Sequence, residues 1–207
     1  MQREEKSERS RRQVLDAALR LFSRRGYRAT TMRDIAEAAK VSTGNVYHHF
    51  PDKDTIFNTL LGELWAATES RRFPYHRALV TGQFPDNLEA LGMAARESVR
   101  EFRPYFAMIY VDVIEFEGTH IQKFYGDLAK LHAEVVGRNG GLDRIAARLR
   151  PGVSPVFALM LTTRMFFSYF TIEVLFNVPE PFGLESAKVV KGIADILRKG
   201  MVAGSDE

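Results

Sequence analysis

Residues 43–49 concentrate hydrogen-bonding side chains in seven positions, with the sequence TGNVYHH. Ser42 is a suitable N-cap for a helix over these residues, and Pro51 disfavours helical backbone at Phe50. Val46 and Phe50 are four positions apart, so they face inward from such a helix and leave the polar side chains facing outward. Amide, hydroxyl and imidazole groups on an exposed helix could hydrogen-bond to base edges or to phosphate oxygens.

A second short helix is expected directly before this one. Thr30 is a suitable N-cap for it. Lys40 and Val41 would form the turn between the two helices. Apolar residues recur at helical spacing as Met32, Ile35, Ala36 and Ala39. Two short helices joined by a tight turn, the second rich in polar side chains, are typical of a helix-turn-helix with its recognition helix.

A longer helix, expected over Ser10–Arg25, precedes this pair and ends at Gly26. Residues 1–9 offer no apolar face, so we expect them to be frayed. The arginines near the start of the helix could touch phosphate or simply face solvent. The predicted three-helix core contains Val14, Leu15, Ala18, Leu19, Phe22, Ile35, Val41, Val46 and Phe50.

Composition and charge are compatible with a cytoplasmic protein that binds nucleic acid. Cysteine is absent, which excludes disulfides and thiolate chemistry, and the charged first twelve residues do not form a secretory signal. The net charge is +4 over residues 1–60 and −1 over residues 61–207. The basic surplus therefore coincides with the helix-turn-helix pattern.

The rest of the chain also has helical periodicity, and the predicted class is all-α. A fourth helix should begin near Asp52 to Asp54 and end near Arg71 to Pro74, bridging a small domain at 1–53 and a larger one at 54–207. Further helices are expected over 85–102, 104–117, 119–138, 142–149, 155–178 and 184–202. The apolar segment 155–176 resembles a membrane span, but a central Arg164 would cost roughly 2.5 to 3.5 kcal/mol on insertion. We therefore expect a helix buried on several sides and no membrane partner.

The segment GYRATTMRDIAEAAKVSTGNVYHHFPDKDTIF, residues 26–57, resembles the DNA-binding signature of the tetracycline-repressor (TetR) family of bacterial transcriptional regulators. The likeness includes Gly-Tyr before the first motif helix, Thr-Thr at its start, Ile-Ala inside it and Val-Ser at the turn. It continues through Gly44, Tyr47, His49, Phe50 and Lys53. Lys40 departs from the pattern, because this position is often glycine in the family.

The resemblance implies a DNA site and a mode of assembly. The implied major-groove contacts are Thr43, Gly44, Asn45, Tyr47 and His48, and the implied phosphate contacts are Thr31, Arg33, His49 and Lys53. Family members are usually homodimers that pair through their last two long helices, here about 154–178 and 185–202. The apolar stripe Val189, Val190, Ile193 and Leu197 either pairs with a second copy or covers the core of its own domain. A palindromic double-stranded operator would follow from such a dimer.

The resemblance also implies a small, largely hydrophobic effector bound in the larger domain. Aromatic and methionine side chains at helical spacing are more often plain core, although methionines also adapt to irregular ligands. Arg164 either binds an anionic group or pairs with an acid such as Glu115. The expected pocket residues are Phe106, Tyr110, Phe124, Tyr125, Met160 and Arg164.

Other functions have weaker support in the sequence. Glu117 and His120 form one E-x-x-H pattern, whereas di-iron bundles need two such motifs and further carboxylates. We expect no catalytic residues, no metal site and no cofactor, because no P-loop, nucleophile elbow or zinc-protease motif is present. The expected function is a ligand-released homodimeric repressor. The alternatives are an activator of the same family and a helical carrier of hydrophobic ligands.

Overall fold

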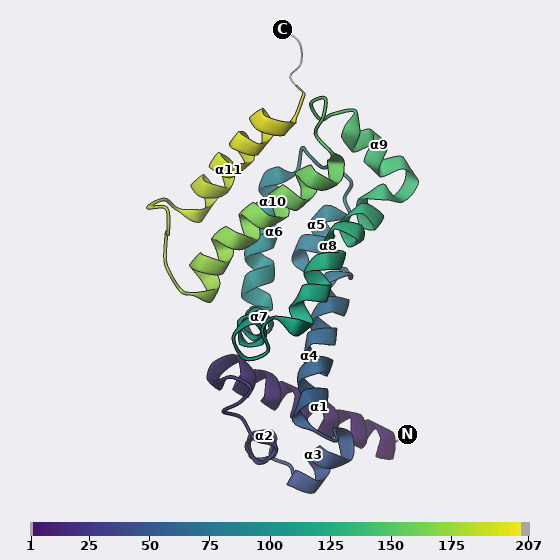
Figure 1. Cartoon of the computed structure of the whole chain (residues 1–207), viewed down its shortest axis with the longest axis vertical. Helices are drawn as coiled ribbons and strands as arrows, with labels where there is room; N and C mark the ends of the chain where they lie inside the picture. The colour runs from purple at the N-terminus through teal and green to yellow at the C-terminus, as the bar shows by residue number, and fades with distance from the viewer. Residues whose placement is uncertain (1, 204–207) are drawn as a thin grey trace. The chain divides into compact units, whose positions relative to one another are not determined.

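The computed structural model describes residues 2–203, apart from the side chains of residues 2, 3 and 139 (Figure 1). The predicted all-α class is confirmed. Within residues 2–203 no strand forms, and one isolated antiparallel bridge pairs Leu149 with Val202.

Eleven α-helices follow one another along the described residues. A 3-10 turn, Arg138–Gly140, and a π-helical turn, Thr171–Leu175, lie among them. The helices are α1 (Gln2–Arg25), α2 (Met32–Ala39), α3 (Thr43–His49), α4 (Lys53–Thr68), α5 (Pro74–Leu79), α6 (Leu88–Glu101), α7 (Arg103–Glu115), α8 (Thr119–Gly137), α9 (Gly141–Ala146), α10 (Pro155–Phe170) and α11 (Ser186–Met201).

The chain forms two compact units. Unit 1 contains the residues up to Ala66 together with Pro104–Phe124, and unit 2 contains Ala67–Arg103 together with the residues from Tyr125 onward. The division falls inside α4, after the first residue of α7 and inside α8. Unit 1 therefore holds α1, α2 and α3 with most of α4 and α7. A functional boundary between residues 53 and 54 remains a prediction.

Unit 1 is built on one apolar core. The predicted inward residues of α1, α2 and α3 are buried in it, and Val41 is partly buried against it. The first half of α4 and Met108 of α7 complete this core. The buried members from the three predicted helices include Val14, Leu15, Ala18, Leu19, Phe22, Ile35, Val46 and Phe50.

The start of α1 differs from the prediction. The helix begins at Gln2, so the expectation of a frayed end is wrong over residues 2–9. Glu4 and Glu5 lie in the first turn, where carboxylates interact favourably with the helix dipole. Glu8 also pairs with Arg11 one turn later, at 3.4 Å. These local charge interactions stabilise the helix over residues 2–9, although this segment has no apolar face.

The start of α2 is set by Thr31 rather than Thr30, so the predicted N-cap is wrong by one residue. The Thr31 hydroxyl accepts from the Asp34 backbone N–H at 3.1 Å, and the Asp34 carboxylate accepts from the Thr31 N–H at 2.8 Å. This reciprocal pair is a capping box. Thr30 is buried, and its hydroxyl donates to the Gly26 carbonyl.

Lys40 ends α2 in the left-handed conformation, with φ at 59°. The turn therefore does require positive φ where related sequences often carry glycine. A residue with a Cβ costs on the order of 1 kcal/mol there.

In unit 2, α6 packs against α5, α10 and α11. A Cβ at Gly92 would lie 2.7 Å from Cγ1 of Val190 and 2.8 Å from the Phe166 ring, so the absence of a side chain permits this close approach. The helix α5 was not predicted. The sequence places the end of a helix near Pro74, but this residue occupies the first turn of a new helix, where proline is well tolerated.

The apolar stripe of α11 is buried inside unit 2, so the second of its two alternatives holds. Among residues 2–203, one helix, Pro155–Leu175, is long and apolar enough to be tested as a membrane span. A single such helix is weak evidence for a membrane, and the inward residues of α10 are fully buried in the unit, as Ala158, Leu159, Phe166 and Phe170. This helix is part of the protein core.

Candidate nucleic-acid interface

The recognition helix α3 has the two faces that the sequence predicts. The Ser42 side chain caps it by accepting from the Asn45 backbone N–H at 3.1 Å. Val46 and Phe50 are 0% and 2% exposed, whereas the Tyr47 side chain, at 53%, faces solvent. Thr43, Gly44 and His48 are also exposed. The helix therefore presents hydroxyl, phenol and imidazole groups on one surface, while two apolar anchors hold it to the core.

Lys53 and Glu115 hold the loop between α1 and α2 from two sides. The Lys53 ammonium donates to the carbonyls of Tyr27 and Thr30, both at 2.7 Å, and lies 4.0 Å from the centre of the Tyr27 ring. The Glu115 carboxylate accepts from the backbone N–H groups of Tyr27 and Arg28, at 3.0 and 2.6 Å. Burial lowers the pKa of Lys53.

Two consequences follow for the predicted site. A phosphate contact by Lys53 stays a prediction, and it would use the proton that the two carbonyls leave available. Glu115 is engaged by the loop, and the two alternatives for Arg164, a contact to an anionic ligand group or a pair with an acid, stay a prediction. No sequence signal could reveal this role of Glu115, which lies 87 and 88 residues from its two partners.

The other predicted phosphate contacts differ in how much of each side chain is engaged. The Thr31 hydroxyl is committed to Asp34, and its hydrogen bond lowers the pKa of that carboxyl. Arg33 is exposed on α2. The Nε2 atom of His49 is buried without a hydrogen-bond partner among the described residues. Burial, followed by repulsion from His48 and other cations, lowers the pKa of His49. In this orientation a phosphate contact by the His49 ring would have to use Nδ1.

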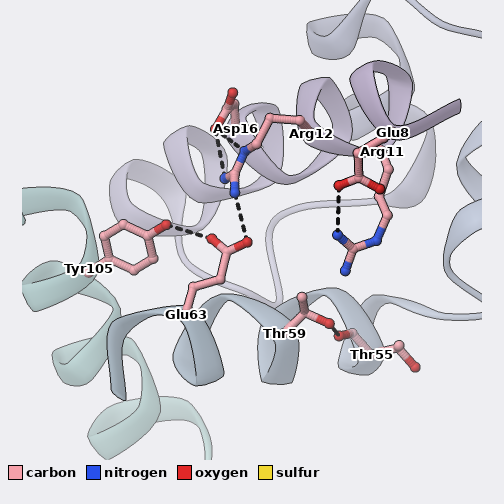
Figure 2. A network of polar contacts seen from close by, with 8 residues as sticks. All are labelled: Glu8, Arg11, Arg12, Asp16, Thr55, Thr59, Glu63 and Tyr105. Carbon is pink, nitrogen blue, oxygen red and sulfur yellow. Dashed lines mark hydrogen bonds and ion pairs between the residues drawn. The ribbon is translucent and has the colours of Figure 1, made fainter. Parts of the chain in front are cut away.

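A polar network joins α1, α4 and α7 within unit 1 (Figure 2). Glu63 of α4 accepts from the Arg12 guanidinium at 2.7 Å and from the Tyr105 hydroxyl at 2.8 Å. Arg12 also pairs with Asp16 one turn along α1. Burial and the hydrogen bond to Glu63 raise the pKa of Tyr105 to about 12. The network holds α1 against α4, and α1 in turn supports the helix-turn-helix.

The six predicted pocket residues fall in both units. Phe106, Tyr110 and Phe124 belong to unit 1, and Tyr125, Met160 and Arg164 belong to unit 2. In unit 1, Phe124 stacks on Trp65, with ring centres 4.1 Å apart.

In unit 2, Arg164 lies over the Tyr125 ring at 4.2 Å, and Met160 contacts Nδ1 of His132 at 3.2 Å. Burial lowers the pKa of His132 to about 4, so this histidine is neutral near pH 7. No motif in the sequence marks His132 as buried. A shared effector pocket for the six residues stays a prediction.

The E-x-x-H pattern does not form a helical metal motif. Glu117 and Gly118 both have positive φ and lie in the turn between α7 and α8, so Glu117 and His120 do not share a helix. His120 instead places Nδ1 2.5 Å from the buried carboxylate of Asp112, whose other oxygen accepts from the Ile121 N–H. These contacts cap the start of α8 and give His120 a structural role.

The comparisons with known proteins agree with this geometry. Residues 14–60 match the family model described as bacterial regulatory proteins, tetR family. Over 51 residues the chain is 49% identical to the HTH-type transcriptional repressor KstR2 of Rhodococcus jostii, covering 25% of each protein. Over 87 residues it is 38% identical to the HTH-type transcriptional regulator BetI of Burkholderia ambifaria, covering 37% of this chain and 45% of the relative. The likeness thus covers less than half of either relative.

Solved structures are similar over nearly the whole chain. NalD of Pseudomonas aeruginosa, described as the secondary repressor of the MexAB-OprM multidrug efflux pump, aligns with a TM-score of 0.60 at 23% identity, covering 96% of this chain and 98% of NalD. The ketosteroid transcriptional regulator KstR2 of Mycobacterium tuberculosis aligns with a TM-score of 0.55 at 23% identity, over 94% and 95% of the two chains. At these identities the likeness establishes the fold alone.

Proposed function

We propose that this chain, whose residues 14–60 match the tetR-family model, is a DNA-binding transcriptional regulator of that family that acts in the cytoplasm as a ligand-released repressor. The proposal rests mainly on the recognition helix α3, whose polar face is exposed while Val46 and Phe50 anchor it to the core. The regulators and repressors among its relatives support a non-enzymatic role.

The proposed regulator is a homodimer on a palindromic operator. With the α11 stripe already buried, the surface that supports pairing is the exposed apolar face of α10, which carries Phe157, Leu161 and Met165. The helix α11, which contacts α10, adds the exposed Ile196. A Cβ at Gly192 would meet nothing within 4 Å, so this position leaves room for a helix of a second copy. Two copies would place their recognition helices about 34 to 36 Å apart, on successive major grooves.

The proposed effector is small and largely hydrophobic. Support comes from the aromatic interior of unit 2, where Phe73 packs against the rings of Phe102 and Phe167. The helix α4 contains residues of both units, so it is the proposed route by which an effector changes the separation of the recognition helices. Such coupling is typically worth about 1 to 3 kcal/mol.

Selection of bound fragments from genomic DNA, using the full chain, tests the DNA-binding role. We expect enrichment of a palindromic sequence, bound as a dimer with an affinity that falls steeply as salt rises. Weak binding that is insensitive to salt and sequence would contradict the proposal and favour the alternative carrier. Reporter transcription from the recovered operator then separates repression from activation.

Trp65 provides the test of effector coupling, because it is the single tryptophan and belongs to α4. Small hydrophobic molecules can be screened for release of the selected operator. We expect each releasing compound to change the emission of Trp65, since its stacking on Phe124 makes the indole sensitive to movement of α4. Release without any change in emission would contradict this route.

A further inference from the structure

Ser10 of α1 contacts the recognition helix directly. Its hydroxyl donates to Oδ1 of Asn45 at 2.6 Å, across 35 residues of sequence. The backbone N–H of Asn45 donates to the Ser42 hydroxyl at 3.1 Å. Asn45 is therefore held twice, through its main chain by the helix cap and through its side-chain oxygen by α1.

An amide held through its oxygen presents its other end. Oδ1 and Nδ2 diverge from one carbon, so the NH₂ group of Asn45 points away from Ser10. This group can donate two hydrogen bonds and accepts none. In the major groove guanine offers two acceptors, O6 and N7, whereas cytosine offers only the N4 donor. The fixed amide is therefore suited to a base edge rich in acceptors.

The surroundings of Asn45 also favour a negatively charged partner. An open groove of about 440 Å³ lies between α1 and the first residues of α3. Lys6 and Arg9 line this groove together with Asn45, and no carboxylate of the described residues does. Cationic walls attract a phosphate-bearing strand and bring base edges within reach of the amide.

We propose that Ser10 is a positioning residue for DNA recognition, which orients the Asn45 amide to read a hydrogen-bond acceptor, foremost guanine, at one position of each half-site. The inference rests on the proposed function, because it assigns the polarity of one contact within that same DNA site. Cytosine is disfavoured at this position, since its exposed N4 group is also a donor.

Selection from a randomised half-site library with the full chain tests this assignment. For the wild type we expect guanine over cytosine by about tenfold at one position, the usual discrimination of one good base contact. The carboxylate of Ser10→Asp would accept from the NH₂ group and turn Oδ1 outward, so preference at that position should move to cytosine or adenine. Ser10→Ala should reduce the preference several-fold, and Ser10→Thr, which keeps the hydroxyl, should restore it.

Ser7→Asp is the matched control. Ser7 is exposed on the same helix, so the substitution adds the same charge near DNA without reaching Asn45. We expect it to weaken binding to all sequences and to leave base preference unchanged. Asn45→Ala should abolish the preference at the assigned position alone. Thermal unfolding of each variant checks that the helices remain folded, and Ser10→Ala and Ser10→Thr decide the matter if Ser10→Asp unfolds.

Two results would overturn the assignment. One is a base preference that is the same in the wild type, Ser10→Ala and Ser10→Asp. The other is an Asn45→Ala variant that loses affinity equally on every sequence, which would make Asn45 a phosphate contact. Failure of the proposed function is distinguishable, because the wild type would then enrich no sequence at all.

Discussion

Two groups of polar side chains in unit 1 differ in how far the fold engages them. Thr43, Tyr47 and His48 on α3 are exposed. Lys53 and Glu115, around the loop 26–31, are bound to backbone groups of that loop. Both groups look equally polar in sequence. The comparison teaches that the engaged group shapes the domain, while the exposed group is available to a partner.

This difference separates two kinds of loss. Removing an engaged charge leaves backbone groups without their partner, so the free energy of unfolding falls first. Removing an exposed side chain costs little stability, typically within about 0.5 kcal/mol, and affects binding alone.

Replacing Lys53 is expected to have the largest effect. Lys53→Met removes a charged donor from two carbonyls, so urea denaturation should show a loss of about 2 to 3 kcal/mol in unfolding free energy. Operator binding should weaken in the same variant. Lys191→Met, at an exposed position on α11, is the control and should change stability by less than about 0.5 kcal/mol. If Lys53→Met kept full stability but lost operator binding, Lys53 would act as the exposed side chains do, by contacting DNA.

Replacing Tyr47 should show the opposite pattern. Tyr47→Ala is expected to lower operator affinity about tenfold, because one base or phosphate contact is lost, with the melting temperature nearly unchanged. Fluorescence anisotropy with labelled operator measures the affinity. Met93→Ala, at an exposed residue of α6, is the control for the loss of an exposed side chain. Unaltered affinity in Tyr47→Ala would contradict the role of α3.

Glu63 sharpens the comparison within the engaged group (Figure 2). Glu63→Ala should lower the unfolding free energy by about 1 kcal/mol, because Arg12 and Tyr105 lose a partly exposed partner. A double-mutant cycle that combines Glu63→Ala with Tyr105→Phe should give a coupling energy that is stabilising for the folded state. Strictly additive losses in that cycle would show that the hydroxyl and the carboxylate act independently.

Arg33 should give the smallest effect. Arg33→Ala is expected to reduce the slope of log affinity against log salt by about 0.9 for each copy bound, as for one lost phosphate contact. Base preference and stability should stay unchanged, because Arg33 is exposed on α2. Titrations at three or more salt concentrations measure the slope, and a changed base preference would instead make Arg33 a base contact.

The sequence by itself determined the local parts of this protein. Periodic apolar residues predicted the all-α class and the inward faces of α1, α2 and α3, since helical spacing fixes which side chains share a face. Ser42 and Pro51 marked the ends of the recognition helix for the same local reason. The motif and the charge surplus then indicated DNA. The sequence did not reveal the capping box at Thr31 or the start of α5 at Pro74, although both features are local. In each case the residues fit two neighbouring positions for the helix boundary.

Tertiary structure alone decided which partners the polar groups have. Ser10 lies 35 residues from Asn45, and Glu115 lies 87 residues from Arg28, so neither contact leaves a periodic trace in the sequence. The stripe of α11 would be apolar whether it paired with a second copy or covered the core of its own unit. Only the packing shows that it covers its own unit. The physical reason is that helical period sets the direction of a side chain along its own helix, whereas the groups it meets there depend on how distant helices pack.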